Sequence, residues 1–68
     1  MDIQVLNPNL RGIPLRDLRL PADIIVLSVN RNGQSIITHG YTRLRIGDVL
    51  TIVGSRESLQ KVTLKFDR

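Results

Sequence analysis

The stretch IIVLSVNRNGQSII, residues 24–37, predicts a β-hairpin around which the rest of the fold is arranged. Its first part, residues 24–29, is almost wholly apolar and β-branched, which indicates a central strand buried on both faces. Asn32 and Gly33 follow, and this pair strongly favours a type I′ turn because that turn needs positive φ at both central residues. We therefore expect residues 34–38 to pair back antiparallel onto the central strand.

The connection HGYTRLRIGD, residues 39–48, leads from the hairpin to a further apolar run, DVLTIVG at residues 48–54. This run predicts a third strand. Gly40 and Gly47 suit backbone angles that residues with a Cβ reach only at a cost, and Asp48 can bond the amides of its own turn. Turn chemistry explains these three residues, so we expect the connection to be mainly structural.

Shorter elements flank this centre on both sides. Residues 3–5 alternate as a strand does, and residues 13–21 predict one or two helical turns that start near Pro14. Ser55 suits the N-cap of a second short helix, while residues 63–68 fit either a closing strand or a tail. The sequence therefore predicts a small α+β domain with a mixed or antiparallel β-sheet, a central hairpin and two short helices.

The composition argues against several kinds of site. Among 68 residues there is no cysteine and a single histidine, so we expect no disulfide framework, no metal site and no cofactor. No nucleophile elbow, P-loop or metal-pair motif is visible, so we expect no enzymatic activity. No apolar run approaches the roughly 20 residues that span a bilayer, and the lack of cysteine fits a cytoplasmic location.

The charge of the chain favours an anionic partner. Lys and Arg total 10 against 6 Asp and Glu, for a net charge of +4, and most of these cations are arginine, whose planar guanidinium suits phosphate and carboxylate. Nucleic acid is not expected as the partner, because single-strand binders stack bases on aromatic side chains and this chain has only Tyr41 and Phe66. A small anionic ligand fits this composition better.

The order and spacing of short motifs carry a family resemblance over residues 15–59. A Leu-x-x-Leu pair precedes a proline, an aliphatic strand ends in Arg-x-Gly, and an Ile-Ile pair precedes Gly-x-Thr-x-Leu-x-x-Gly-Asp and a second aliphatic strand that ends in glycine. The residues are Leu15, Leu18 and Pro21; Arg31 and Gly33; Ile36 and Ile37; and Gly40, Thr42, Leu44, Gly47, Asp48 and Gly54. In this pattern the chain resembles the TrkA-C or RCK-C family, the C-terminal domain of the regulators of potassium conductance.

The resemblance implies a cytoplasmic regulatory module that forms a homodimer and, in many members, senses a small ligand near the dimer interface. Such domains are attached to cation channels, potassium-uptake regulators and cation-proton antiporters, and in some members the ligand is cyclic di-AMP. Residues 1–68 would then be a single TrkA-C-like domain from a larger membrane transport protein or its subunit. Two alternatives stay open: the same domain on a ClC-type chloride channel or other anion permease, and a structural dimerisation module without a ligand.

Seven polar or cationic residues are candidates for binding such a ligand. They are Arg16, Arg19, Asn30, Arg31, His39, Arg43 and Arg45. Arg16 and Arg19 are three apart, so a helical turn places them on one face, away from the leucines. Asn30 and Arg31 flank the predicted hairpin turn. For all seven, an ordinary solvated surface position is the alternative interpretation.

The connection contributes three of these candidates and departs from the family pattern nearby. Arg43 and Arg45 are two apart, so extended backbone puts both arginines on one exposed face and Leu44 and Ile46 on the other, toward the core. His39 is the one side chain that can change its charge between pH 5 and 8. Many relatives have proline in place of Thr38 and an acidic residue in place of Tyr41. In a dimer, an anion that bridges two copies of one basic patch would relieve their repulsion.

Overall fold

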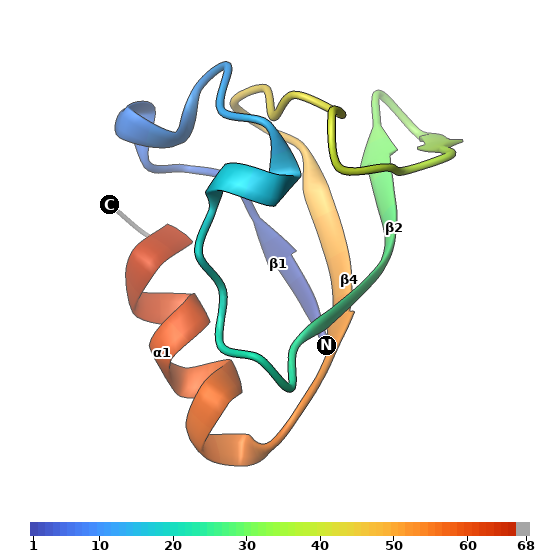
Figure 1. The fold of residues 1–68 in the computed structure, drawn as a ribbon. Helices are drawn as coiled ribbons and strands as arrows, with labels where there is room; N and C mark the ends of the chain where they lie inside the picture. The colour runs from blue at the N-terminus through green and yellow to red at the C-terminus, as the bar shows by residue number, and fades with distance from the viewer. Residues whose placement is uncertain (67–68) are drawn as a thin grey trace.

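The computed structural model describes residues 1–66 as one β-sheet with one α-helix packed against it (Figure 1). In chain order the elements are strand β1 (Asp2–Gln4), the 3₁₀ turns η1 (Pro8–Leu10) and η2 (Leu15–Asp17), strands β2 (Ile25–Arg31), β3 (Gln34–Ile36) and β4 (Val49–Val53), and helix α1 (Arg56–Phe66). The sheet order is β1-β4-β2-β3, and every neighbouring pair is antiparallel. The expected α+β class and central hairpin are confirmed, but one of the two expected helices is only a 3₁₀ turn.

The β2–β3 hairpin forms at the expected turn. Asn32 and Gly33 have φ of 54° and 80°, the left-handed values that a type I′ turn requires. The returning strand is shorter than expected, because β3 ends at Ile36 and the next residue, Ile37, is 92% exposed. As a result, β2 has a β3 partner only along residues 29–31.

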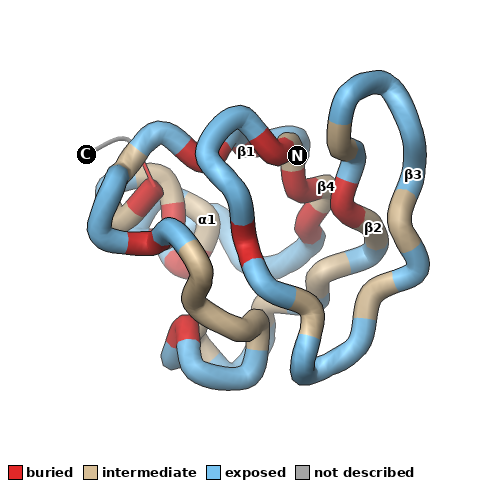
Figure 2. Tube along the Cα trace, turned by 90° about the horizontal axis from the view of Figure 1, so that it is seen from above, coloured by how far each residue is buried: buried red, intermediate tan, exposed pale blue. Residues whose placement is uncertain are grey.

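Strand β2 is not buried on both faces, contrary to the sequence prediction. Its register with β4 places Val29 opposite Leu50 on the core side and Ile25 opposite Val53 on the other side. Val29 is fully buried, whereas Ile25 and Leu27 are each 58% exposed. The physical reason is that α1 and the connecting loops cover only one face of the sheet, as Figure 2 shows by the position of the buried residues. The register between β2 and β4 also shifts between Val26 and Ser28, so side chains do not alternate regularly between the two faces of the sheet at Leu27.

The two helical segments differ from expectation in opposite ways. The first contains one 3₁₀ turn, η2, and Arg19 just after it has a left-handed backbone with φ of 54°, which a right-handed helix cannot continue. The second, α1, runs through residues 63–66, so these residues form neither a strand nor a tail, while residues 67–68 lie outside the described part of the chain. The cause is a cap from far away in sequence. Asn7 donates from Nδ2 to the Lys65 carbonyl and from its backbone amide to the Phe66 carbonyl, each at 3.0 Å.

The N-terminal end of α1 is capped from two sides. Ser55 acts as the expected N-cap, since its hydroxyl accepts a hydrogen bond from the Ser58 amide at 3.2 Å. Asp23, which precedes β2, accepts from the Ser55 amide at 2.9 Å and from the Ser58 hydroxyl at 2.6 Å. These bonds, the Ser58 hydroxyl first, lower the pKa of Asp23 to about 2.

The core is a single aliphatic cluster with one aromatic ring. Its buried members are Ile3, Val5, Leu10, Leu18, Val29, Leu44, Leu50, Ile52, Val62 and Phe66. Leu44 is buried as expected, but Ile46 is 47% exposed. The backbone makes a tight turn there, with Gly47 at φ 93°, so the alternation of an extended chain does not continue. Within residues 1–66, no helix has the length and apolar character needed to cross a membrane.

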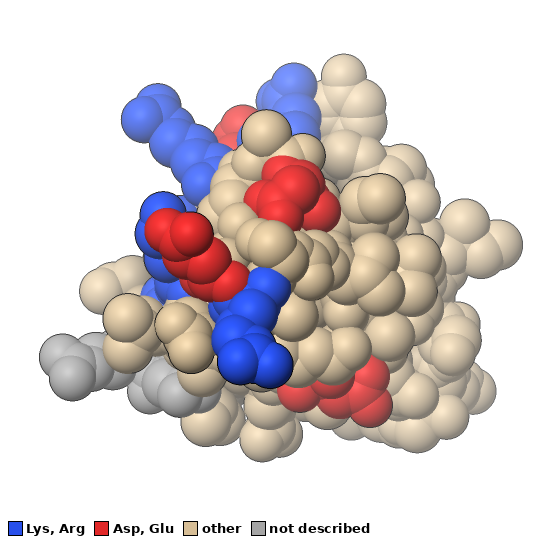
Figure 3. Space-filling model, turned by 90° about the horizontal axis from the view of Figure 1, so that it is seen from below, with Lys and Arg blue, Asp and Glu red and all other residues tan. Residues whose placement is uncertain are grey.

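An exposed apolar area, which we name the β2 patch, is formed by Ile25, Leu27 and Val53. Ile25 and Leu27 are each 58% exposed, and Val53 is 41% exposed. Residues 25–28 of β2 lie beyond the end of β3, so this part of the strand also has an unpaired backbone edge. On the face seen from below, Figure 3 shows most of the charged side chains on one half and a largely uncharged surface on the other.

Candidate functional site

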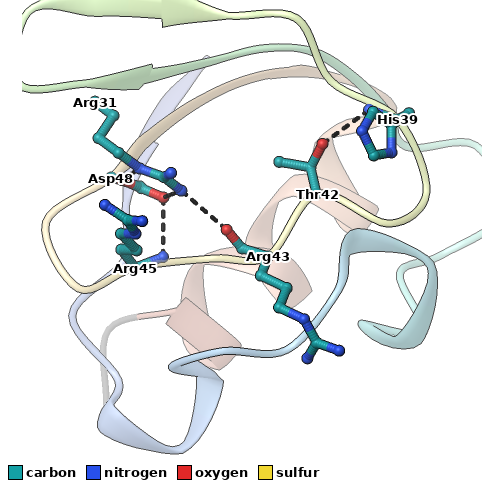
Figure 4. A network of polar contacts seen from close by, with 6 residues as sticks. All are labelled: Arg31, His39, Thr42, Arg43, Arg45 and Asp48. Atoms are coloured by element: carbon teal, nitrogen blue, oxygen red, sulfur yellow. Dashed lines mark hydrogen bonds and ion pairs between the residues drawn. The ribbon is translucent and has the colours of Figure 1, made fainter.

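A buried ion pair joins the end of β2 to the turn that precedes β4 (Figure 4). Arg31 donates from Nε to Asp48 Oδ1 at 2.9 Å and from Nη2 to Asp48 Oδ2 at 2.8 Å. The backbone amide of Arg45 donates to the same Oδ2 at 2.9 Å. The Asp48 side chain is only 2% exposed and that of Arg31 is 19% exposed. The pair is therefore bidentate and largely excluded from water.

The surroundings of the pair keep both groups charged. Burial by itself would raise the pKa of Asp48, but the hydrogen bonds from Arg31 and from the Arg45 amide, together with the nearby positive charge, more than offset it and lower the pKa. The hydrogen bond to Asp48 in turn raises the pKa of Arg31. Each group therefore stabilises the ionised form of the other.

Arg31 also fastens the connection to the strand. Its Nη2 donates to the Arg43 carbonyl at 2.9 Å, in addition to its bonds with Asp48. The Arg31 guanidinium could bind a ligand only in addition to these structural hydrogen bonds. Sequence reasoning assigned Asp48 to the amides of its own turn, which the Arg45 bond agrees with, but missed its pairing with Arg31, because the two residues lie 17 positions apart.

Arg43 and Arg45 do not form the common face that extended backbone would give. Arg43 donates from Nη1 to the Gly12 carbonyl at 2.7 Å, and Figure 4 shows its side chain pointing away from that of Arg45. The Asp48 amide donates to the Arg45 carbonyl at 3.0 Å, so the backbone turns directly after Arg45. Both arginines are exposed, but they face different parts of the surface.

A second polar cluster forms where the segment after β3 meets η2. The Arg16 amide donates to the Gly40 carbonyl at 3.0 Å, and the Arg16 guanidinium carbon lies 4.5 Å from the centre of the Tyr41 ring. His39 is the first residue of the segment that we name the His39 turn, residues 39–42. Its amide donates to Thr42 Oγ1 at 3.1 Å, and its Nδ1 accepts from the Tyr41 amide at 3.1 Å. The structure thus brings the candidates Arg16 and His39 into one cluster.

Tyr41 belongs to this cluster, although sequence reasoning noted it only as a departure from the family pattern. Its side chain is 67% exposed, and the centres of the Tyr41 and His39 rings lie 6.1 Å apart. The signal in the sequence was an aromatic residue next to a turn glycine. That signal could not identify Arg16 as its partner, because η2 lies far away along the chain.

The two remaining candidates lie outside both clusters. Arg19 follows η2 and is exposed, and its left-handed backbone places it off the helical face that it was expected to share with Arg16. Asn30 is exposed on the open face of the sheet, where it pairs across the strands with Ser35 and Val49. The seven candidates therefore do not form a single basic patch within one copy of the domain.

The polar groups of these clusters suit the binding of an anion. The side chains of Arg16 and Arg45 are exposed and carry guanidinium groups that match phosphate or carboxylate oxygens, and so does that of Arg19 outside the clusters. Across residues 1–66, His, Cys, Asp and Glu do not gather in any group of three that could hold a metal ion. These guanidinium groups can bind an anion through their positive charge and by donating hydrogen bonds.

Comparison with known proteins gives a consistent family. A model of the TrkA-C domain family matches residues 2–67. A "Putative Na(+)/H(+) antiporter YjbQ" of Bacillus subtilis (strain 168) is 41% identical over 54 residues, which cover 79% of this chain and 9% of that protein. A "Putative transport protein" of Serratia proteamaculans (strain 568) is 35% identical over 66 residues, which cover 94% of this chain and 12% of that protein. The chain thus spans about a tenth of the length of these curated relatives.

A solved structure shares the fold in detail. It is described as "Structure of RCK domain with cda", and it superposes on this chain with a TM-score of 0.91 at 36% sequence identity. The match covers 97% of this chain and 94% of the solved chain, so a separate domain of this size has been solved. The expected resemblance is therefore confirmed by sequence and by structure, and the chain belongs to the TrkA-C domain family.

Proposed function

We propose that this domain is the cytoplasmic regulatory, ligand-sensing and dimerisation module of a cation transport protein, either potassium or cation-proton. The names of its relatives support a transporter as the host, and one of them is named as a Na(+)/H(+) antiporter. Since the chain covers about a tenth of those relatives, it corresponds to an appended domain and not to the part that moves the ion. Its role is to regulate the host, and no catalytic step is part of this proposal.

The β2 patch is the structural observation that carries this proposal. Ile25 and Leu27 are more than half exposed beside an unpaired strand edge, a combination that isolated domains usually avoid. A two-fold dimer would bury the same patch on both copies. Burying the exposed parts of the Ile25 and Leu27 side chains contributes roughly 1 kcal/mol for each side chain, and a dimer buries four such side chains. We therefore place the homodimer interface at this edge of β2.

The ligand in this proposal is a small anionic nucleotide, with cyclic di-AMP as the first candidate. The structural relative is described with "cda", and the net charge of +4 with exposed guanidinium groups suits phosphate. The seven candidate residues do not form one patch in a single copy, so a site that uses several of them would draw on both copies of a dimer. The ligand would then act by favouring one dimer arrangement, and it can shift that equilibrium only by its difference in affinity for the two.

Dimerisation is tested by sedimentation of Leu27→Glu. A charge in the β2 patch should convert the dimer to monomer, because a buried pair of carboxylates is strongly unfavourable. Leu64→Glu is the matched control, since Leu64 is 70% exposed on α1, outside the β2 patch. The proposed interface is wrong if wild type is a monomer throughout the micromolar range, or if both variants sediment alike.

Ligand sensing is tested by thermal denaturation with cyclic di-AMP, ATP, AMP and NAD(H). A ligand present at about 100 times its dissociation constant adds roughly 2.7 kcal/mol to stability. The shift should shrink in Arg16→Ala and persist in Arg56→Ala, which removes an exposed arginine at the start of α1. If none of these nucleotides shifts the transition of a dimeric wild-type protein, the domain is a structural dimerisation module without one of these ligands.

A further inference from the structure

The His39 turn contains a hydrogen bond that can exist only when the imidazole is neutral. His39 Nδ1 accepts from the Tyr41 amide at 3.1 Å, so this nitrogen must be unprotonated. In the imidazolium both ring nitrogens carry hydrogen, and two N–H donors would then face each other. We propose that His39 is a proton-operated latch: the neutral imidazole accepts from the Tyr41 amide and holds the ring of Tyr41 in place, and a proton on Nδ1 breaks that bond and releases Tyr41.

Backbone hydrogen bonds hold the turn on η2, because the Gly40 carbonyl accepts from the Arg16 amide at 3.0 Å and the Thr42 carbonyl accepts from the Leu15 amide at 2.9 Å. The bond to His39 Nδ1 is the one that fixes the Tyr41 amide within this frame. The Thr42 hydroxyl accepts from the His39 amide at 3.1 Å and the Thr42 amide donates to the His39 carbonyl at 3.0 Å, which defines the two ends of the turn. Between these ends, the Tyr41 amide has His39 Nδ1 as its acceptor. His39 and Tyr41 are both exposed, so water can replace the bond as soon as the ring stops accepting.

The charged groups near the turn come from η2 and from the residue that follows the turn. From η2, the Arg16 guanidinium lies 4.5 Å from the centre of the Tyr41 ring, and Asp17 pairs with Arg16 at 3.8 Å. On the turn itself, the Tyr41 ring lies 6.1 Å from the His39 ring. Arg43 follows the turn, but its guanidinium is bonded to the Gly12 carbonyl. A proton on His39 would therefore add a positive charge to the cluster that already contains the Arg16 guanidinium and its partner Asp17.

The consequence for regulation rests on the proposed function. Arg16 is a candidate ligand residue, and its side chain stacks on Tyr41 only while the turn holds that ring in place. A proton on His39 would then alter the position of Arg16 without any contact between proton and ligand. The domain would report pH as well as ligand, and the transporter attached to it would receive both signals.

The latch is tested by the amide protection factor of Tyr41 in the ligand-free 68-residue chain, measured by NMR hydrogen exchange and corrected for the intrinsic rate at each pH. Protection should fall roughly fivefold between pH 7.5 and pH 5.5, the factor expected for loss of one ordinary hydrogen bond. Tyrosine fluorescence gives a second reading from the same residue, because Tyr41 is the only tyrosine and the chain has no tryptophan.

Two variants separate the latch from other effects of pH. His39→Asn keeps an oxygen that can accept from the amide two residues later but cannot titrate, so protection should stay the same at both pH values. His39→Ala removes the acceptor, so protection should be low at both. The latch is overturned if Tyr41 is equally protected at both pH values in wild type, or if His39→Asn follows the wild-type profile. Because no ligand is present, a failed search for the nucleotide leaves this result unaffected.

Discussion

Removal of the Arg31 guanidinium should destabilise the domain more than removal of any other arginine side chain in the candidate site. In Arg31→Ala, Asp48 would stay buried at 2% exposure with the Arg45 amide as its one remaining donor. Breaking one side of a buried, hydrogen-bonded ion pair costs about 3 kcal/mol or more. A chain of this length has a total stability of roughly 3–10 kcal/mol, so the variant should lose a third of it or more.

The measurement is urea denaturation of Arg31→Ala and wild type, followed by far-UV circular dichroism. The same loss corresponds to a fall in Tm of about 12–24 °C for a domain of this size. Arg45→Ala is the matched control, because it keeps the backbone amide that bonds Asp48 and removes only an exposed cation. The control should lose less than about 1 kcal/mol. Equal losses in the two variants would refute the assignment of the pair as the fastening of the connection.

The pH dependence of the same variant gives an independent check. In wild type the folded pKa of Asp48 is lowered, so its contribution to stability is full above its unfolded pKa and is lost as pH falls through the folded one. In Arg31→Ala, the hydrogen bonds and the charge of Arg31 no longer offset the effect of burial, so the pKa of Asp48 should rise. Protonation of Asp48 should then stabilise the folded state. The stability difference between wild type and Arg31→Ala should therefore narrow from pH 6 to pH 3. A constant difference would show that the charge of Asp48 is not involved.

Two further predictions concern the start of α1. Asp23→Asn should lower Tm, because the Asp23 carboxylate caps the helix, with the Ser58 hydroxyl as its strongest partner. The folded pKa of Asp23, about 2, lies below its unfolded value. The stability that the Asp23 carboxylate contributes is therefore full above about pH 4 and is lost toward pH 2. Thermal scans in which Asp23→Asn and wild type lose stability in parallel from pH 5 to pH 2 would contradict this. Gly54→Ala should cost about 1 kcal/mol in urea denaturation, since its Cβ would lie 3.2 Å from the Asp23 backbone oxygen and 2.5 Å from Ile24 Cδ1, which would have to rotate away. Gly40→Ala meets only an ordinary 3.5 Å contact and should cost clearly less. Equal costs would contradict the packing argument.

The parts of the fold that could be predicted are those encoded by neighbouring residues. The hairpin turn followed from the pair Asn32 and Gly33, and the start of α1 from the N-cap Ser55. The end of α1 could not be predicted, because its cap comes from Asn7 at the other end of the chain. The open face of β2 was missed for a different reason. An apolar run looks the same whether its outer face is covered within the domain or left bare, as at Leu27.

The candidate site shows the same division between local and distant information. Composition and turn chemistry identified the cations and the role of Asp48 in its own turn. They could not tell which cations are already engaged, because the partner of Arg31 lies 17 residues away and that of Arg43 lies 31 residues away. The face shared by Arg16 and Arg19 failed because the chain leaves the helical conformation at Arg19, which no residue-type preference indicated.

The distribution of these distant contacts indicates which part of the domain can respond to a ligand. Helix α1 is capped at one end by Asp23 and at the other by Asn7, and residues 43–48 of the connection are fastened by Arg31. Each of these fastenings would have to break before its element could move. The His39 turn differs, because its side-chain bonds are local and exposed, and Ile37 just before it is 92% exposed. A ligand with the differential affinity of an ordinary effector, about 1–3 kcal/mol, can rearrange such a turn but cannot break the buried Arg31 pair. Under the proposed function, a signal that starts at a bound ligand should therefore pass through the His39 turn and its contact with η2, while the sheet and α1 stay as they are.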